Sequence, residues 1–355
     1  MPSAPTVDDF AASPNRRLLL RAAWIGLTTG IVEAAIPLIQ HAVFGRMRIY
    51  APYHIAWMSP LAGIALFLVV GAILALALRP LQRRSPQQAL QIATTTLLFL
   101  AAWSVTLKYP QLNAWAALVL AAGAGVQGGR LTHGAWLDRL ARRTLVPMGA
   151  AIAVIAATML YVPPWRESRT IAALPEPPSG APNVLLLILD TVRAQSLSLY
   201  GASNPTTPRL DAFARSSVVF DRAMSTAPWT VPSHASMLTG RYPHELTIDW
   251  LTPLDDTTTT LAEVLSRHGY MTGGFVANYM MSTKVGLARG FQHYQEYRIS
   301  TRQLLLSSAV LRRIAYWPRL RAALGRYDTV NRKRAPEANA ELLAWLDERK
   351  EARPF

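Results

Sequence analysis

The sequence predicts a two-part protein, an α-helical membrane domain followed by an α/β domain. Long apolar stretches fill the first 163 residues, and a proline-rich segment covers residues 164–182. After this segment, short apolar strands alternate with helical patterns, which is typical of α/β proteins. The predicted strands are 184–189, 217–220 and 272–277, and the predicted helical segments are 208–215, 233–238 and 260–268. Because 51% of the 355 residues are hydrophobic, part of the chain is expected to lie in lipid. We therefore divide the chain into a membrane domain (1–163), a linker (164–182) and an α/β domain (183–355).

Five stretches of the first part are long enough to cross a bilayer, which takes about 17–25 residues for each helix. They are Leu18–Phe44, Ile55–Leu78, Ala89–Leu107, Leu112–Gly129 and Leu145–Val162. The first is the weakest prediction, because Arg21 and Glu33 lie inside it. The prolines of the linker disfavour a helix or a central strand there and favour an extended stalk.

The arginines predict the orientation of these spans. They gather before the first span, after the second and after the fourth, which the positive-inside rule places in the cytoplasm. Five spans then leave the α/β domain outside, so we expect a multi-pass protein of the inner (plasma) membrane whose C-terminal domain is extracytoplasmic. The same loops explain much of the net charge of +15, and the basic residues lack an aromatic stacking platform. Membrane lipids, and no nucleic acid, are the expected partners.

Two sequence features of the second part predict a reactive site. The apolar strand Val184–Leu189 ends at Asp190, which puts a carboxylate at the edge where α/β sheets build their sites. Thr230 precedes a helical pattern and has Pro232 in its first turn. A hydroxyl and a carboxylate on one metal ion form an activated nucleophile. The alternatives are that Asp190 caps a turn and that Thr230 is only a helix N-cap. The absence of cysteine excludes disulfides, thiolate zinc sites and a cysteine nucleophile.

From about Pro182 onward the chain resembles the sulfatase family of the alkaline phosphatase superfamily, specifically its membrane-anchored bacterial members. The resemblance is carried by the strand ending at Asp190, Tyr200-Gly201, Thr206–Asp211, Phe220–Ala223 and the block Thr230–Pro243. It implies an alkaline phosphatase-like fold and a divalent metal ion held by Asp190 and Thr230, with Thr230 as the nucleophile. It also implies substrate contacts from His234, which replaces an arginine of the motif, and from Asn278. The alternative for both residues is a position on the surface or behind the residues that touch the substrate.

The residue at position 230 changes the chemistry that the resemblance implies. Sulfatases convert a Cys or Ser there to formylglycine, and a threonine cannot form that aldehyde because its Cβ carries a methyl group. The chain is in this respect similar to phosphoethanolamine transferases and lipoteichoic acid synthases, which also have five spans. Thr191 stands where many sulfatases have a second aspartate. We therefore expect hydrolysis or transfer at a sulfate or phosphate ester, including a lipid-linked one, and the residues favour phosphate.

The metal site is predicted to be incomplete in this chain. The family completes it with a later Asp-His or Asp-Asn pair, and no such pair occurs before Phe355. The sequence is thus interpreted as the N-terminal part of a longer enzyme, C-terminally incomplete and inactive alone. The alternative function is a catalytically inactive membrane-anchored scaffold or binding protein. Oxygen ligands suit Ca²⁺, Mg²⁺ or Mn²⁺ equally, and Zn²⁺ if a histidine joins them.

A basic segment near the end of the chain is the last feature of note. Residues 302–334 contain nine Lys or Arg and one acidic residue, interleaved with leucine, isoleucine and tryptophan. Such a segment next to a membrane can lie on anionic headgroups. A solvated helix face explains the same pattern, and the sequence leaves both interpretations open.

Overall fold

The structure is a computed structural model that describes residues 13–44, 54–132, 135–249, 252–296, 299–323, 333–349 and 353–355. The chain divides into two compact units. The first contains helices α1–α5, most of α6, and α10–α12; the second contains the end of α6 and the remaining elements. The helices α10–α12 thus group with the membrane helices, although they lie within the residue range expected for the α/β domain.

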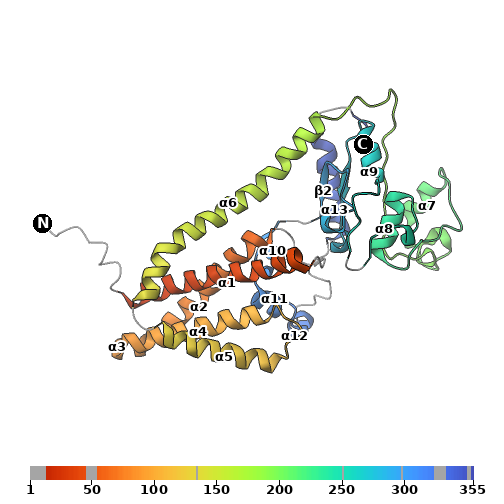
Figure 1. The fold of residues 1–355 in the computed structure, drawn as a ribbon. Coiled ribbons are helices and arrows are strands. Elements are labelled where there is room, and N and C mark those ends of the chain that lie inside the picture. The colour runs from red at the N-terminus through yellow and green to blue at the C-terminus, as the bar shows by residue number, and fades with distance from the viewer. Residues whose placement is uncertain are drawn as a thin grey trace. The chain divides into compact units, whose positions relative to one another are not determined.

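The first unit is built from long apolar helices (Figure 1). They are α1 (Pro14–Phe44), α2 (Ile55–Ala77), α4 (Pro86–Thr106), α5 (Ala114–Leu131) and α6 (Trp136–Ala172), with the short α3 (Arg79–Arg84) between α2 and α4. Among the described residues, four of them are long and apolar enough to cross a membrane: 14–40, 55–77, 86–106 and 136–172. The predicted span Leu112–Gly129 is helical as α5, whose last turns carry Gln127 and Arg130. A membrane domain of helices is therefore supported, and the count of five spans stays a prediction.

Small residues let α1 and α2 approach closely. A Cβ on Gly26 would lie 2.5 Å from the carbonyl oxygen of Gly63, and one on Gly30 would meet the backbone of Ser59 and Pro60. Without a hydrophobic driving force between helices in lipid, such close backbone packing is a main source of association. Gly26 and Gly30, one helical turn apart, therefore lie on the face of α1 that α2 covers.

Arg21 and Glu33, the two charged residues inside the predicted first span, both have partners on other helices. The Arg21 Nε donates to Asp138 Oδ1 of α6 at 2.7 Å, and both side chains are buried. The Glu33 carboxylate accepts from Ser59 of α2 at 3.2 Å and from Ser104 of α4. The charges that weakened the prediction of the first span are thus the residues that join α1 to its neighbours.

The helix α6 extends further than the sequence predicted. It contains the predicted span Leu145–Val162 and continues through Pro163 and Pro164 to Ala172. The expectation that these prolines end the helix is wrong, because a proline removes one backbone donor and kinks a helix without ending it in every context. Only residues 173–182 of the expected linker are free of helix.

The second unit packs helices against a small sheet. Its α-helices are α7 (Pro208–Ala214), α8 (Thr230–Thr239), α9 (Leu261–Arg267) and α13 (Ala335–Glu348). The first three overlap the helical segments predicted for 208–215, 233–238 and 260–268, and α13 was not predicted. The strands β1 (Gly273–Phe275) and β2 (His293–Gln295) pair in parallel with Gly273 opposite His293. One core cluster surrounds α8 and consists of Val231, Ala235, Leu238, Ile248, Leu254, Met281, Val285 and Leu287.

Two predicted strands are not strands in the described chain. Residues 184–189 and 217–220 have no ladder partner, and Leu185 and Leu187 are 63% and 72% exposed. Only the start of the first run is paired, because the Val184 amide donates to the Phe355 carbonyl at 2.6 Å, while Met271 donates to the neighbouring Pro354. A strand needs backbone partners along its length, and an apolar pattern alone does not supply them. The predicted strand at 272–277 does form, as β1.

Candidate functional site

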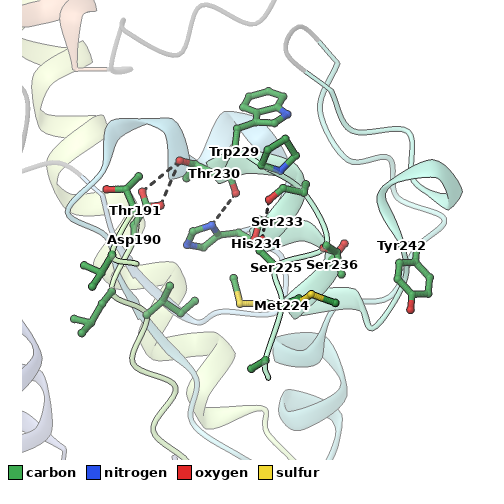
Figure 2. Close-up of a pocket in the computed structure, with 18 of the residues that line it drawn as sticks. Asp190, Thr191, Met224, Ser225, Trp229, Thr230, Ser233, His234, Ser236 and Tyr242 are labelled. Atoms are coloured by element: carbon green, nitrogen blue, oxygen red, sulfur yellow. Dashed lines mark hydrogen bonds between the residues drawn. The ribbon is translucent and has the colours of Figure 1, made fainter. Parts of the chain in front are cut away.

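Asp190 and Thr230, forty residues apart in sequence, lie within hydrogen-bonding distance of each other (Figure 2). The Thr230 Oγ1 is 3.3 Å from Asp190 Oδ2 and 3.4 Å from Oδ1, so the hydroxyl donates to the carboxylate. Thr230 is the first residue of α8, and Trp229 before it is extended. The structure thus brings together the two residues on which the predicted site depends.

Helix α8 holds Thr230 in place by burying its apolar face. Val231, Ala235 and Leu238 pack into the core cluster, and Gly240 ends the helix in the left-handed conformation at φ 69°. A glycine takes this conformation without the steric cost of a Cβ. The N-terminus of α8 therefore points its backbone N–H groups toward the region of Thr230, which is the arrangement that binds anions at helix ends.

Thr191, directly after Asp190, has a strained backbone. Its φ of 62° lies in the left-handed region, and among the described residues no other non-glycine has a positive φ. A β-branched residue rarely adopts this conformation, which costs of order 1–3 kcal/mol. Such strain concentrates at functional sites. Here it lies in the turn, formed by Asp190 and Thr191, that ends the extended segment before Asp190. The sequence marked Thr191 as a departure from the family pattern but contained no signal of this strain.

Asn278, predicted to contact substrate, contacts Asp190 in the structure. Its Nδ2 donates to Asp190 Oδ2 at 2.8 Å, and its Oδ1 accepts from the Met280 amide at 3.1 Å. These bonds fix the amide from both ends. Asn278 therefore orients the carboxylate that faces Thr230.

His234, the other predicted substrate contact, is buried one turn after Thr230 on α8. Its Nδ1 lies 2.7 Å from the Thr230 carbonyl oxygen. Because a carbonyl only accepts, Nδ1 must carry the hydrogen, and Nε2 is an acceptor whenever the ring is neutral. An anionic oxygen of a substrate is therefore contacted favourably only by the protonated ring.

The donors present fit a divalent cation in kind but not in number. Asp190 and Thr230 offer hard oxygen atoms, which Ca²⁺, Mg²⁺ and Mn²⁺ prefer. Asn278 presents its nitrogen to Asp190, and among the described residues no group of three or more His, Cys, Asp or Glu could hold a metal ion. The described residues thus offer two oxygen donors and no complete ligand set.

The site opens into a cavity of about 770 Å³ that is lined by both ends of α8. Thr230, Ser233 and Ser236 line it at intervals of three residues, which places their hydroxyls along one face of the helix. Ser233 pairs with Ser225 at 2.8 Å, whereas the buried Ser236 hydroxyl has no hydrogen-bond partner within the described part of the chain. The spacing of the serines is visible in the sequence, but Ser233 and Ser236 were not among the predicted site residues.

Comparison with known proteins gives matches to part of the chain. The family model described as Sulfatase matches residues 182–304. N-acetylgalactosamine-6-O-sulfatase of Bacteroides thetaiotaomicron is 33% identical over 101 residues, which are 27% of this chain and 20% of that protein. Steryl-sulfatase of Mus musculus is 37% identical over 100 residues, 27% of this chain and 15% of that protein. Arylsulfatase D of Homo sapiens is 33% identical over 104 residues, 26% of this chain and 18% of that protein.

These matches cover only a small part of the relatives. The chain spans 15–20% of the length of the three proteins. No solved structure matches the chain significantly.

Proposed function

We propose, from the premise that residues 182–304 belong to the sulfatase family of the alkaline phosphatase superfamily, that Thr230 is the nucleophile of a membrane-anchored ester-cleaving site. The family implies an alkaline phosphatase-like fold and a sulfate-ester hydrolase-like function, typically dependent on a divalent metal ion. The observation that carries the proposal is the approach of the Thr230 hydroxyl to both oxygens of Asp190, at 3.3 and 3.4 Å.

The reaction proposed is an in-line displacement. The Thr230 oxygen forms a bond to the sulfur or phosphorus atom while the bond from that atom to the ester oxygen breaks, and the leaving alcohol keeps the electron pair. The hydroxyl proton passes to Asp190, whose carboxylate already accepts the hydrogen bond of the Thr230 hydroxyl. The leaving alkoxide takes up a proton from water. A second displacement, by water or by an acceptor alcohol, then frees Thr230 and makes the outcome hydrolysis or transfer.

Three other groups support this step. Asn278 keeps Asp190 turned toward Thr230 through its 2.8 Å hydrogen bond. The N-terminus of α8 favours the negative charge of the non-bridging oxygens. When protonated, His234 would donate from Nε2 to the same oxygens. A divalent cation bound by Asp190 and Thr230 would supply further neutralisation of charge and lower the pKa of the hydroxyl.

Phosphate is the better substrate class for this residue set. The methyl group on the Cβ of Thr230 prevents formation of the aldehyde that sulfatases use, so the hydroxyl itself must attack. A phospho-threonine intermediate needs no such conversion. The substrate we propose is therefore a phosphate ester, with sulfate esters as the class that the relatives' names indicate.

The cellular setting proposed is an extracytoplasmic second unit held at the membrane. The four long apolar helices are compatible with membrane insertion, and the arginine-rich segments favour a cytoplasmic N-terminus. A cysteine introduced at Ser203, in a chain that has none, reports the side: labelling of intact cells by an impermeant maleimide is expected. Labelling only after lysis would overturn the orientation.

Trapping of the covalent intermediate tests the chemistry. The purified full chain is incubated with Mg²⁺, Ca²⁺, Mn²⁺ or Zn²⁺ and either an aryl phosphate or an aryl sulfate, quenched in acid and digested. We expect a phospho group on the peptide that contains Thr230, and none in Thr230→Ala. Thr239→Ala is the matched control, because Thr239 lies at the other end of α8 and its described hydrogen bonds go only to backbone groups, the Ala235 carbonyl and the Arg241 amide.

The rival proposal is an inactive membrane-anchored scaffold or binding protein. One observation favours it: the described residues contain no group of three metal-ligating side chains. It predicts that no adduct forms with any of the four cations and that Thr230→Ala changes neither stability nor ligand binding. An adduct on Thr230 excludes this rival.

A further inference from the structure

Helices α10 (Thr301–Leu306), α11 (Ala309–Ala315) and α12 (Pro318–Ala323) carry a basic surface that the chemistry at Thr230 does not use. Residues 301–323 contain five arginines and no acidic residue. They belong to the same compact unit as the membrane helices. The basic helices α10–α12 are therefore part of the unit that contains the long apolar helices, and their arginines lie close to the proposed membrane.

The junction between α10 and α11 is buried against the helix bundle. α10 packs against α2 and α11 against α4 (Figure 1). Ser307, Ser308, Ala309 and Val310 are all buried. The Ala309 amide donates to Glu33 Oε2 at 2.9 Å, so the carboxylate that joins α1 to α2 and α4 also holds the start of α11. A buried carboxylate with this many donors fixes the position of the junction firmly.

The partners of Glu33 place the junction near one end of the bundle. Ser59 lies four residues after the start of α2, and Ser104 lies two residues before the end of α4. At 1.5 Å per residue, both are within about 6 Å of their helix ends. Lys108, just beyond α4, approaches Glu33 to 3.9 Å. If α2 and α4 cross the membrane, α10–α12 lie where the hydrocarbon region gives way to the headgroups.

The outward side of these helices has the composition of a membrane interface. Arg313 and Arg319 are exposed, and so are Ile314 and Trp317, at 46% and 56%. A solvated helix face accounts for the arginines but not for a half-exposed tryptophan and isoleucine beside them. Tryptophan and arginine together are typical of the interfacial region, where the ring and the aliphatic stem lie in apolar surroundings and the charge reaches the headgroups.

We propose that α11 and α12 bind the phosphate of anionic phospholipid headgroups through Arg313 and Arg319, with Ile314 and Trp317 in the adjoining acyl boundary. A guanidinium presents paired N–H donors that match two oxygens of a phosphate. The docking of the α10–α11 junction on Glu33 holds both arginines at the headgroup level. The site is independent of the chemistry at Thr230.

Titration with a soluble lipid tests the proposal. The full chain in a neutral detergent is titrated with dioctanoyl phosphatidylglycerol and, separately, with dioctanoyl phosphatidylcholine. Loss of one interfacial arginine is expected to weaken binding of the anionic lipid about fivefold, hence about 25-fold for Arg313→Gln/Arg319→Gln. Binding of phosphatidylcholine should stay the same. Arg313→Lys/Arg319→Lys keeps the charge but loses the paired donors, so it should bind phosphatidylglycerol more weakly than the wild type and more tightly than Arg313→Gln/Arg319→Gln.

A matched control removes the same charge elsewhere. Arg209→Gln/Arg215→Gln changes two exposed arginines of the second unit and should bind phosphatidylglycerol like the wild type. Equal binding by Arg313→Gln/Arg319→Gln and the wild type would overturn the proposal. If that double variant fails to fold, the wild type and the lysine variant still decide it, because affinity for phosphatidylglycerol that does not fall with salt would overturn it equally.

Discussion

The buried ion pair between α1 and α6 gives the sharpest test of how the membrane unit is held together. Asp138 accepts from Arg21 at 2.7 Å and from Arg17 at 2.8 Å, and Arg21 also donates to Thr94 of α4 at 3.0 Å. Arg21 and Asp138 are each 2% exposed. Replacing Asp138 by leucine would leave Arg21 buried without its counter-charge, while the Arg17 side chain, 34% exposed, can turn to water.

The magnitude follows from the burial. Removal of one partner of a buried ion pair costs about 3–5 kcal/mol, and we expect the lower end because Arg21 keeps its bond to Thr94. At about 2–4 °C per kcal/mol for a unit of this size, Asp138→Leu should lower the melting midpoint by about 6–12 °C. The assay is the thermal unfolding of the detergent-solubilised chain, followed by tryptophan fluorescence.

Two further variants decide whether the uncompensated charge is the cause. Arg21→Met/Asp138→Leu removes both charges and should recover most of the loss. Asp347→Leu is the matched control, since Asp347 is exposed on α13, and it should melt like the wild type. If Asp138→Leu also melts like the wild type, or if the double variant is no more stable than Asp138→Leu, the reasoning is refuted.

Three other predictions follow from the structure. Gly63→Val should separate α1 from α2 and lower the free energy of unfolding by about 1–3 kcal/mol. Gly149→Val should be neutral, because a Cβ added at Gly149 would meet no neighbouring group within 4 Å. Equal melting midpoints for the two variants would contradict the close packing of α1 and α2. Thr191→Gly should relieve the left-handed strain and raise the stability of the second unit by about 1 kcal/mol, as measured by denaturant unfolding, and a loss of stability would contradict it. Burial raises the pKa of the Glu296 carboxyl, although hydrogen bonds from Thr283 and the nearby Lys284 and Lys333 act to lower it. The protonated carboxyl therefore stabilises the fold at pH values below the ordinary pKa of 4.5, and this stabilisation is lost as the pH rises through the raised pKa. Glu296→Gln should flatten that part of the stability profile against pH, and an unchanged profile would show that another group causes it.

The helices were the most predictable part of the molecule. Apolar stretches of sufficient length identified each long helix of the first unit, because a spanning helix is recognised from a continuous apolar stretch and not from its contacts with distant residues. The end of α6 escaped prediction because local proline chemistry argued for a break at Pro163 and Pro164, while the helix continues to Ala172. The role of Arg21 also escaped it, because its partner Asp138 is 117 residues away in sequence.

The site was predicted in its centre and not in its surroundings. Asp190 and Thr230 were identified from the strand-end and helix-start patterns, and their hydroxyl and carboxylate do lie together. The contact between Asn278 and Asp190 depends on the path of the chain over 88 residues, which no local pattern encodes. The expected strand at Val184–Leu189 was wrong because an apolar run specifies a strand only when neighbouring backbone is present to pair with it.

The grouping of α10–α12 with the long apolar helices has a consequence for the proposed position of the second unit outside the cell. A protease that cuts within residues 173–182 severs the covalent stalk, yet the fragment that follows the cut still includes α10–α12 and their buried junction on Glu33. The severed fragment would stay in the membrane pellet instead of being shed into the medium. Shedding would also require the α10–α11 junction to separate from the helix bundle, which breaks the hydrogen bond from the Ala309 amide to the Glu33 carboxylate.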